Sequence, residues 1–237
     1  MAEKTPEEMR EAVLAIREKM AAAARETGRD PAEVQLCAAC KTRTAETVAA
    51  SAALPIDVFG ENHVQELCAN FDAGAYCGKP SHFIGHLQTN KIKKVLGRAS
   101  LIQSVGSEHL LTAIEKEAAK AGIVQNVLLE VNIGGEAAKS GFAPEDIAAA
   151  AETALAMPHV RVRGLMTIPP VAMEPHGNLA YFEKMRWLYV DINAKIYDNR
   201  MEYLSMGMSG DFADAIRCGS NMIRVGTAIF GARDYTK

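Results

Sequence analysis

Lys41 ends the apolar stretch VQLCAACK and is the first residue of this sequence with a type and position suited to chemistry. Burial disfavours the charged form of an amine and lowers its pKa, and a neutral amine can attack an aldehyde. Lysines that form Schiff bases depend on this property. In the competing interpretation, the aliphatic part of Lys41 is buried and its ammonium group simply reaches solvent. The residue type therefore predicts a Schiff-base lysine, with a solvent-reaching lysine as the alternative.

Two segments near the carboxyl end of the chain, LSMGMSGD and MIRVGTAIFG, combine glycines with hydroxyl side chains. In the first, Ser209 is expected to cap the helix that follows, and the N–H groups at a helix N-terminus can bind phosphate. In the second, Gly226 and Thr227 would add a backbone N–H group and a hydroxyl group. A plain helix cap is the competing interpretation for Ser209. Gly207 and Gly210 favour phosphate, because glycine lets a ligand come close to the backbone.

Arg224 lies among apolar residues of the last predicted strand, where a guanidinium group is rarely buried without a partner. Asn62 ends the segment FGEN, where it either faces a ligand or caps the next helix. Together these residues imply a ligand with an aldehyde, a phosphate and an acceptor for Arg224. Pyridoxal 5′-phosphate (PLP) has all three, the acceptor being its pyridine nitrogen. A sugar phosphate in a Schiff-base aldolase would supply the first two, and the residues alone leave this alternative open.

Short β-branched stretches alternate with longer helical stretches along the chain, which indicates parallel βαβ units. The predicted strands are Val34–Lys41, Ile56–Gly60, His82–Gly85, Leu101–Val105, Val127–Ile133, Val162–Ile168, Tyr203–Gly207 and Met222–Ile229. The predicted helices are one from Pro6 to just before Gly28, Thr44–Ala53, Glu108–Ala121, Pro144–Ala156, Leu179–Tyr197 and Asp211–Arg217. Eight such units predict a (β/α)8 TIM barrel, with an open doubly wound sheet as the alternative. No linker divides the chain, so residues 1–237 are predicted to form a single barrel domain.

Composition excludes several classes of protein. A net charge of −3 and a pI near 6.1 argue against a general nucleic-acid-binding protein. No apolar run is as long as the roughly 18 residues that span a bilayer, and the charged N-terminus MAEKTPEEMR has no signal-peptide core. Five scattered cysteines suit free thiols better than a disulfide framework. The expectation is a cytoplasmic protein that binds neither nucleic acid nor membrane.

Two apparent metal or redox motifs have spacings that do not suit a metal or redox site. Cys37 and Cys40 are three residues apart on a predicted strand, so their side chains point to opposite faces and cannot chelate one ion. His82 and His86 are four residues apart, but they lie on a strand leading into a turn rather than on a helix. We therefore expect no metal site and no thioredoxin-like activity.

The lysines outside the first strand are predicted to have lesser roles. The basic run of Lys91, Lys93, Lys94 and Arg98 fits a solvated helix face better than a basic rim that attracts anions. Lys139 follows a glycine-rich loop, and either a solvated position or a second contact to phosphate or aldehyde suits it.

Seven segments that follow one another from about residue 34 to residue 233 resemble the motifs of a known family: ACKTRTAETV, FGENHVQE, HFIGHLQTNK, KSGF, GLMTIP, LSMGMSGDF and IRVGTAIFGAR. That family is the pyridoxal phosphate homeostasis proteins, also called proline-synthase co-transcribed proteins, with the barrel fold of the alanine racemase N-terminal domain. The resemblance implies a Schiff base between PLP and Lys41, and Arg224 as the partner of the pyridine nitrogen. The other cofactor-binding residues that it implies are Ser209, Gly226 and Thr227 at the phosphate, and Asn62 and Met166 near the ring.

Four positions depart from the usual pattern of the family. Cys40 precedes the lysine where Ser or Thr is common, His63 replaces Tyr or Arg, Ser81 replaces Trp, and Gly106 replaces Asp. Cys40 should face the helices, so it leaves the assignment of Lys41 intact. His63 and Gly106 are expected nearer the barrel mouth, where they would alter access to the site.

The resemblance implies a PLP-binding protein of vitamin B6 homeostasis without catalytic turnover, with an amino-acid racemase as the alternative. Arg224 does not release its proton, so the pyridine nitrogen facing it should stay unprotonated, which weakens the ring as an electron sink. Alanine racemase works with the same arrangement, so this argument is incomplete. A racemase needs a second base, and the sequence, which stops at Lys237, shows no strong Tyr or His candidate for it. The expected protein is a monomer whose partners are PLP and PLP-dependent apo-enzymes.

Overall fold

Eight parallel strands form a closed barrel in the computed structural model, which describes residues 4–136 and 138–231. Each strand pairs with the next along the chain, and the last pairs with the first. The strands are β1 (Gln35–Ala39), β2 (Val58–Glu61), β3 (Ser81–Phe83), β4 (Leu101–Val105), β5 (Gln125–Val131), β6 (Val160–Thr167), β7 (Tyr203–Ser205) and β8 (Met222–Val225). The predicted barrel is confirmed, and pairing of β8 with β1 excludes the open sheet.

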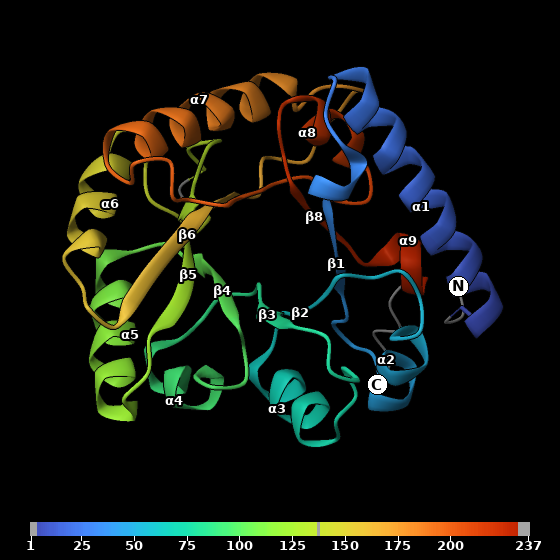
Figure 1. Cartoon of the computed structure of the whole chain (residues 1–237), viewed down its shortest axis with the longest axis horizontal. Coiled ribbons are helices and arrows are strands. Elements are labelled where there is room, and N and C mark those ends of the chain that lie inside the picture. The colour runs from blue at the N-terminus through green and yellow to red at the C-terminus, as the bar shows by residue number, and fades with distance from the viewer. Residues whose placement is uncertain (1–3, 137, 232–237) are drawn as a thin grey trace.

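Helices surround the strands in chain order, as the colours of Figure 1 show. They are α1 (Pro6–Glu26), α2 (Ala45–Ser51), α3 (Val64–Asp72), α4 (Ile92–Val95), α5 (Glu108–Ala121), α6 (Ile147–Leu155), α7 (Leu179–Lys195), α8 (Phe212–Arg217) and α9 (Thr227–Phe230), with short 3-10 turns η1 (Pro31–Glu33) and η2 (Thr89–Lys91). The amino-terminal helix α1 packs beside α8, α9 and α2, and so covers the outside of the barrel where β8 meets β1 (Figure 1).

The start of α1 follows from its sequence. Thr5 accepts a hydrogen bond from the N–H group of Glu8, and the Glu8 carboxylate accepts one from the N–H group of Thr5, which together form a capping box. Met9, Val13 and other residues at helical spacing are buried against the barrel. Across the described residues, no helix combines the length and the apolar character needed to cross a membrane.

Side chains alternate between two environments along each strand. Outward side chains such as Leu36 and Phe59 pack against the helices in the main hydrophobic core. Inward side chains such as Cys37, Val58 and Met222 fill the barrel interior. Because parallel strands all end at the same rim, the residues that follow them gather at one end of the barrel.

The last predicted strand is too long. The segment Met222–Ile229 was expected to be continuous, but β8 ends at Val225, where its pairing with β1 also ends. Gly226 turns the chain, and Thr227 begins the short helix α9. The apolar residues Ile229 and Phe230 are buried by helical packing instead, which a short apolar run cannot distinguish from a strand.

Candidate functional site

Lys41 lies two residues beyond β1, on a tight turn at the carboxyl-terminal rim of the barrel. The N–H group of Arg43 donates to the carbonyl of Cys40 at 3.0 Å to close this turn. Thr42, at its centre, has a φ angle of 64°, a left-handed conformation that is unusual for a β-branched residue. The carboxylate of Glu66 on α3 accepts the N–H group of Thr42 at 3.0 Å and so holds the turn.

A cavity of about 460 Å³ lies next to this turn. It is lined by Lys41, Asn62, His63, Val64, Gln65, Gly85, His86, Gln88 and Lys91. The structure therefore brings together two of the predicted site residues, Lys41 and Asn62. Asn62 does not cap α3, because the N-cap position is His63. A Cβ atom on Gly85 would lie 2.1 Å from the carbonyl oxygen of Asn62, so only glycine lets the chain after β3 pass this close to Asn62.

Arg224 points into the barrel from β8, and only 4% of the residue is exposed. Its Nη1 atom donates to the hydroxyl of Ser205 at 2.5 Å, and its Nη2 atom donates to the carbonyl of Thr167 at 2.8 Å. Burial lowers the pKa of the guanidinium, and the negative charge of Glu130 opposes this shift. Arg224 is thus buried inside the barrel, where two of its nitrogen atoms have protein partners.

Met166 also faces the interior of the barrel and is fully buried. It packs with Leu101 and Leu128 in a small apolar cluster inside the barrel. Met166 pairs in register with Ser205, the hydroxyl partner of Arg224, across the β6–β7 ladder. It is therefore part of the wall on the same side of the barrel as the guanidinium.

The three residues predicted to bind phosphate lie in the segments that follow β7 and β8. Ser209 is exposed in the segment before α8, and Thr227 is exposed at the first position of α9. Gly226, between β8 and α9, has its Cα facing β1, since an added Cβ atom would lie 3.0 Å from the carbonyl oxygen of Ala39. All three are at the same end of the barrel as Lys41.

The expectation that Ser209 caps a helix is wrong. Helix α8 begins three residues later, at Phe212, and Asp211 is at its N-cap position. The Asp211 carboxylate accepts the N–H group of Met208 at 2.7 Å and thereby closes the segment on itself. Gly207 has a φ angle of 96° and packs against Ala215, so its role is in the backbone turn.

A buried carboxyl group, Glu61, lies at the end of β2 beside this site. Its Oε1 atom accepts hydrogen bonds from Asn70 Nδ2 at 2.7 Å and from the Tyr76 hydroxyl at 3.1 Å. Its Oε2 atom is buried and has no hydrogen-bond partner among the described residues. Burial raises the pKa of Glu61 to about 7, and the charge of Glu66 adds to that rise.

Several polar residues inside the barrel were not predicted. Glu130 on β5 is buried, and burial raises its pKa while the charge of Arg224 lowers it. Ser205 on β7 and Gln103 on β4 are both fully buried. The available signal was a polar residue at an inward position of an otherwise apolar strand, as in VLLEV, YLS and LIQSV.

The cysteines and histidines of the discounted motifs lie in different surroundings. Cys37 lies inside the barrel and Cys40 packs in the core outside it, and burial raises the pKa of both thiols, that of Cys37 to about 12. His82 is buried in the interior, whereas His86 lines the Lys41 cavity. Among residues 4–136 and 138–231, no group of three or more His, Cys, Asp or Glu side chains is arranged to hold a metal ion.

The basic residues divide between different surroundings. Lys91 lines the Lys41 cavity, whereas Lys93 pairs with Glu117 on the neighbouring helix. Lys139 is ion-paired with Glu136 and donates to the carbonyl of Pro169 at 3.3 Å. It lines a separate cavity, together with residues of the segment between β6 and α7.

Of the four positions that depart from the family pattern, His63 bears most directly on the site because it lines the Lys41 cavity. Gly106 lies beside the segment after β5, since an added Cβ atom would lie 2.7 Å from the backbone nitrogen of Gly141. Ser81 begins β3 at the other end of the barrel and donates to the carbonyl of Arg98 at 2.6 Å.

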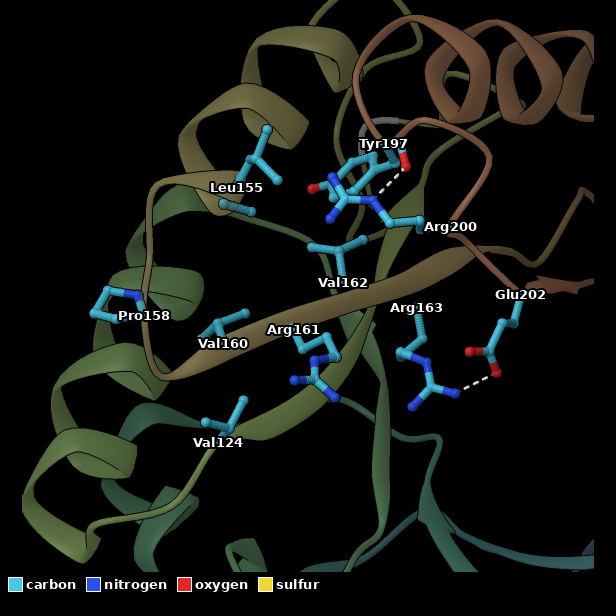
Figure 2. Close-up of a pocket in the computed structure, with 11 residues that line it drawn as sticks. Val124, Leu155, Pro158, Val160, Arg161, Val162, Arg163, Tyr197, Arg200 and Glu202 are labelled. Carbon is cyan, nitrogen blue, oxygen red and sulfur yellow. Dashed lines mark hydrogen bonds and ion pairs between the residues drawn. The ribbon is translucent and has the colours of Figure 1, made fainter.

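A second cavity, of about 500 Å³, lies at the amino-terminal half of β6 (Figure 2). Its charged side chains are largely paired: Arg163 with Glu202, and Arg200 with the carbonyl of Tyr197 at 2.9 Å. It contains none of the predicted site residues and lies at the end of β6 opposite to Met166. The predicted site residues therefore lie at the carboxyl-terminal rim and not in this second cavity.

Comparison with known proteins shows which family the chain resembles over most of its length. Residues 13–234 match the family described as "Alanine racemase, N-terminal domain". The chain is 40% identical over 218 residues to a pyridoxal phosphate homeostasis protein of Aquifex aeolicus, covering 92% of this chain and 95% of that protein. A crystal structure of an unknown protein from Bifidobacterium adolescentis is 35% identical, with a TM-score of 0.89 over 95% of each chain. A structure of PipY from Synechococcus elongatus with PLP bound is 30% identical, with a TM-score of 0.77 over 91% of this chain and 100% of PipY.

Proposed function

The chain belongs to the pyridoxal phosphate homeostasis protein family, and from this we propose that residues 1–237 act as one domain that holds PLP on Lys41. It is a PLP-binding protein of vitamin B6 homeostasis. The observation that carries the assignment of Lys41 is its position, in a cavity at the carboxyl-terminal rim of a closed barrel. That rim is where barrels of this kind bind their ligands.

The residues at this rim fit PLP. The Lys41 cavity, at about 460 Å³, is within the roughly 300–1,000 Å³ typical of cofactor sites. An amine, a buried guanidinium and two exposed hydroxyls, from Lys41, Arg224, Ser209 and Thr227, match the aldehyde, the pyridine nitrogen and the phosphate. When bound, PLP supplies an aldehyde that bonds to an amine and a ring that can withdraw electrons. The chain supplies the groups that hold each part of it.

Each predicted residue has a separate task in this proposal. Lys41 provides the amine that bonds covalently to the aldehyde, and Asn62 lies beside it in the same cavity. Arg224 donates an N–H group to the pyridine nitrogen and keeps its own proton, so that nitrogen stays unprotonated. Met166 forms part of the apolar wall near the ring.

The phosphate is held by residues from the last two loops. Ser209 and Thr227 offer hydroxyl groups, and Gly226 offers a backbone N–H group at the start of α9. Barrels frequently bind phosphate with the loops after their seventh and eighth strands. The exposure of Ser209 and Thr227 supports this task, because neither hydroxyl is buried against protein.

We propose further that the bound cofactor is stored rather than used for turnover, and that a monomer releases it to PLP-dependent apo-enzymes. The name of the Aquifex aeolicus relative supports a role in homeostasis. One observation favours the racemase alternative: His63 and His86 line the same cavity as Lys41, and either imidazole is a candidate second base.

The covalent assignment is tested by titrating the protein with PLP, reducing the complex with borohydride and mapping the modified peptide. We expect the label on Lys41, and none on a Lys41→Ala variant. Lys91→Ala is the matched control, since Lys91 lines the same cavity, and it should keep the label. A label on Lys91 or Lys139 would contradict the assignment.

Storage is tested by incubating the PLP-loaded protein with L-alanine or L-serine in deuterated water. We expect D-isomer formation far below about 1 s⁻¹, the lower end of ordinary enzyme rates. Turnover at such a rate, abolished in His63→Ala or His86→Ala, would instead establish a racemase. Transfer of PLP to an apo-enzyme and light scattering during gel filtration test release and the monomeric state.

A further inference from the structure

A row of buried polar side chains crosses the interior of the barrel and ends at Arg224. Arg224 Nη1 lies 2.5 Å from Ser205 Oγ, and Ser205 Oγ lies 2.7 Å from Gln103 Oε1. Gln103 Nε2 lies in turn 2.9 Å from His82 Nδ1. The row therefore connects β8, β7, β4 and β3, although Ser205 and Gln103 are 102 residues apart in the chain.

The surroundings of the row are apolar. Met222, Leu101 and Leu128 are fully or almost fully buried inside the barrel. Branched apolar side chains usually fill such an interior, and a buried polar group is costly unless it is hydrogen-bonded. The polar side chains of the row satisfy one another, so together they form a unit in which each depends on its neighbours.

The direction of every hydrogen bond in the row follows from Arg224. A guanidinium can only donate, so the Ser205 oxygen accepts from it, and the Ser205 hydroxyl hydrogen must find another acceptor. That acceptor is Gln103 Oε1. Rotating the amide by half a turn would put the hydroxyl between two donors, so Gln103 Nε2 necessarily faces His82.

His82 is therefore the acceptor at the end of the row. Its Nδ1 atom accepts a hydrogen bond from the amide N–H group of Gln103, so the proton of the neutral imidazole is on Nε2. Burial lowers the pKa of His82 to about 3, so the ring is neutral at physiological pH and Nδ1 stays available as an acceptor. His82 also lines a small cavity at the amino-terminal end of the barrel, together with Asp57 and Asn126.

The row and one further contact fix the plane of the guanidinium. Nη1 is held by Ser205, and Nη2 is held by the carbonyl of Thr167 on β6. Two donors anchored on different strands determine how a planar five-donor group is turned, and so where its other N–H groups point.

We propose that Ser205 and Gln103 are positioning residues that hold Arg224 in the orientation in which it meets the pyridine nitrogen of bound PLP. This inference rests on the proposed function. It assigns a task to two residues that are too deeply buried to line the Lys41 cavity.

The row itself can be tested without cofactor. In ¹⁵N-histidine NMR spectra of the wild-type protein, we expect His82 to show a protonated Nε2 and an unprotonated Nδ1 from pH 5 to pH 8. In a Gln103→Met variant this preference should weaken. A wild-type His82 with its proton on Nδ1 would overturn the direction of the row, and with it the proposal.

The task of the row is tested by comparing PLP with 1-deaza-PLP, an analogue that has carbon in place of the pyridine nitrogen. Ser205→Ala should weaken PLP binding about tenfold and analogue binding less than about twofold, since only PLP has the atom that Arg224 meets. Ser220→Ala is the matched control, because Ser220 is another fully buried serine, and its hydroxyl lies 2.8–3.1 Å from the carbonyl oxygens of Leu204, Met206 and Met222. It should affect both ligands alike.

Each outcome decides a different point. Equal losses for both ligands in Ser205→Ala would mean that Ser205 supports the barrel alone, and the proposal would be wrong while PLP binding stands. Absence of covalent PLP in the wild-type protein would instead contradict the proposed function. Where Ser205→Ala does not fold, Ser205→Cys keeps the size of the side chain and is compared in the same way.

Discussion

The backbone N–H group of Thr42 donates to Oε1 of Glu66 at 3.0 Å, and this contact ties the turn that carries Lys41 to helix α3. Thr42 has a φ angle of 64°, which costs free energy for a β-branched residue and persists only when its surroundings enforce it. Glu66 constrains Thr42 through this hydrogen bond, and the helix that carries Glu66, α3, is packed against the barrel. The position of the Lys41 amine therefore depends on a side chain that does not line its cavity.

Replacing Glu66 with alanine should loosen the Lys41 turn. We expect Glu66→Ala to weaken PLP binding by about five- to tenfold, which corresponds to the roughly 1 kcal/mol of one hydrogen bond. Glu66→Gln retains an oxygen at the position of Oε1 and should bind PLP within about twofold of the wild type. The measurement is an absorbance titration with PLP. Equal affinity of the alanine variant and the wild type would show that the turn needs no anchor.

Glu61 should make the folded protein less stable as the pH rises. Folding raises the pKa of Glu61 from 4.5 to about 7, so between these values the folded protein holds a proton that the unfolded chain has lost. The resulting stabilisation is complete below pH 4.5 and is lost as the pH rises through about 7.

The comparison with Glu61→Gln isolates this effect, because glutamine does not titrate and keeps an oxygen for Asn70 and Tyr76. Between pH 5 and pH 8, the free energy of unfolding of the wild type should fall relative to that of the variant by up to about 3 kcal/mol. Urea unfolding at several pH values gives both curves. Parallel curves would mean that Glu61 ionises at its ordinary pKa.

The phosphate should account for much of the affinity for PLP. Pyridoxal, which lacks it, should bind more weakly by at least the roughly 1.5–3 kcal/mol of one charge-assisted hydrogen bond. Ser209→Ala and Thr227→Ala should weaken PLP binding and leave pyridoxal binding unchanged. Both side chains are exposed, so stability should change by less than about 0.5 kcal/mol. Equal losses for the two aldehydes would move these hydroxyls away from the phosphate.

Gly85 should tolerate no side chain. An added Cβ atom would lie 2.1 Å from the carbonyl oxygen of Asn62, so Gly85→Ala must displace backbone beside the Lys41 cavity. We expect a loss of at least 1–3 kcal/mol in the free energy of unfolding, as for other overpacked positions, together with weaker PLP binding. Gly210→Ala is the control for stability, since its Cβ atom would meet nothing within 4 Å. Similar thermal unfolding of the two variants would contradict the expected clash.

The parts of the fold that could be predicted are those with strong local signals. The predicted bounds of β4 and α5 are correct. The strand begins and ends at branched apolar residues, Leu101 and Val105, and Ser107 and Gly122 cap the helix at its two ends. Arg224 could be placed inside the barrel because period-two alternation fixes which face of a strand each residue occupies. The grouping of Lys41 with Asn62 followed from the rule that strand ends meet at one rim.

The errors arose where tertiary contacts decide between local alternatives. Ser209 was predicted as a cap, but the Asp211 carboxylate closes the segment and α8 starts later. The partners of Arg224 could not be predicted at all. Ser205 and Thr167 reach it only because barrel closure sets β6 and β7 at particular levels beside β8, and no local pattern encodes that stagger.

The row from Arg224 to His82 also has a consequence for proton traffic. A chain of hydrogen bonds conducts a proton only if every member can accept at one side and release at the other, as hydroxyls and water do. Arg224 neither accepts nor releases a proton, so conduction along the row stops at its upper end. A proton that enters at His82, from the cavity at the amino-terminal end, is therefore not passed along this row beyond Arg224. The row therefore fixes the guanidinium without serving as a proton relay between the two ends of the barrel.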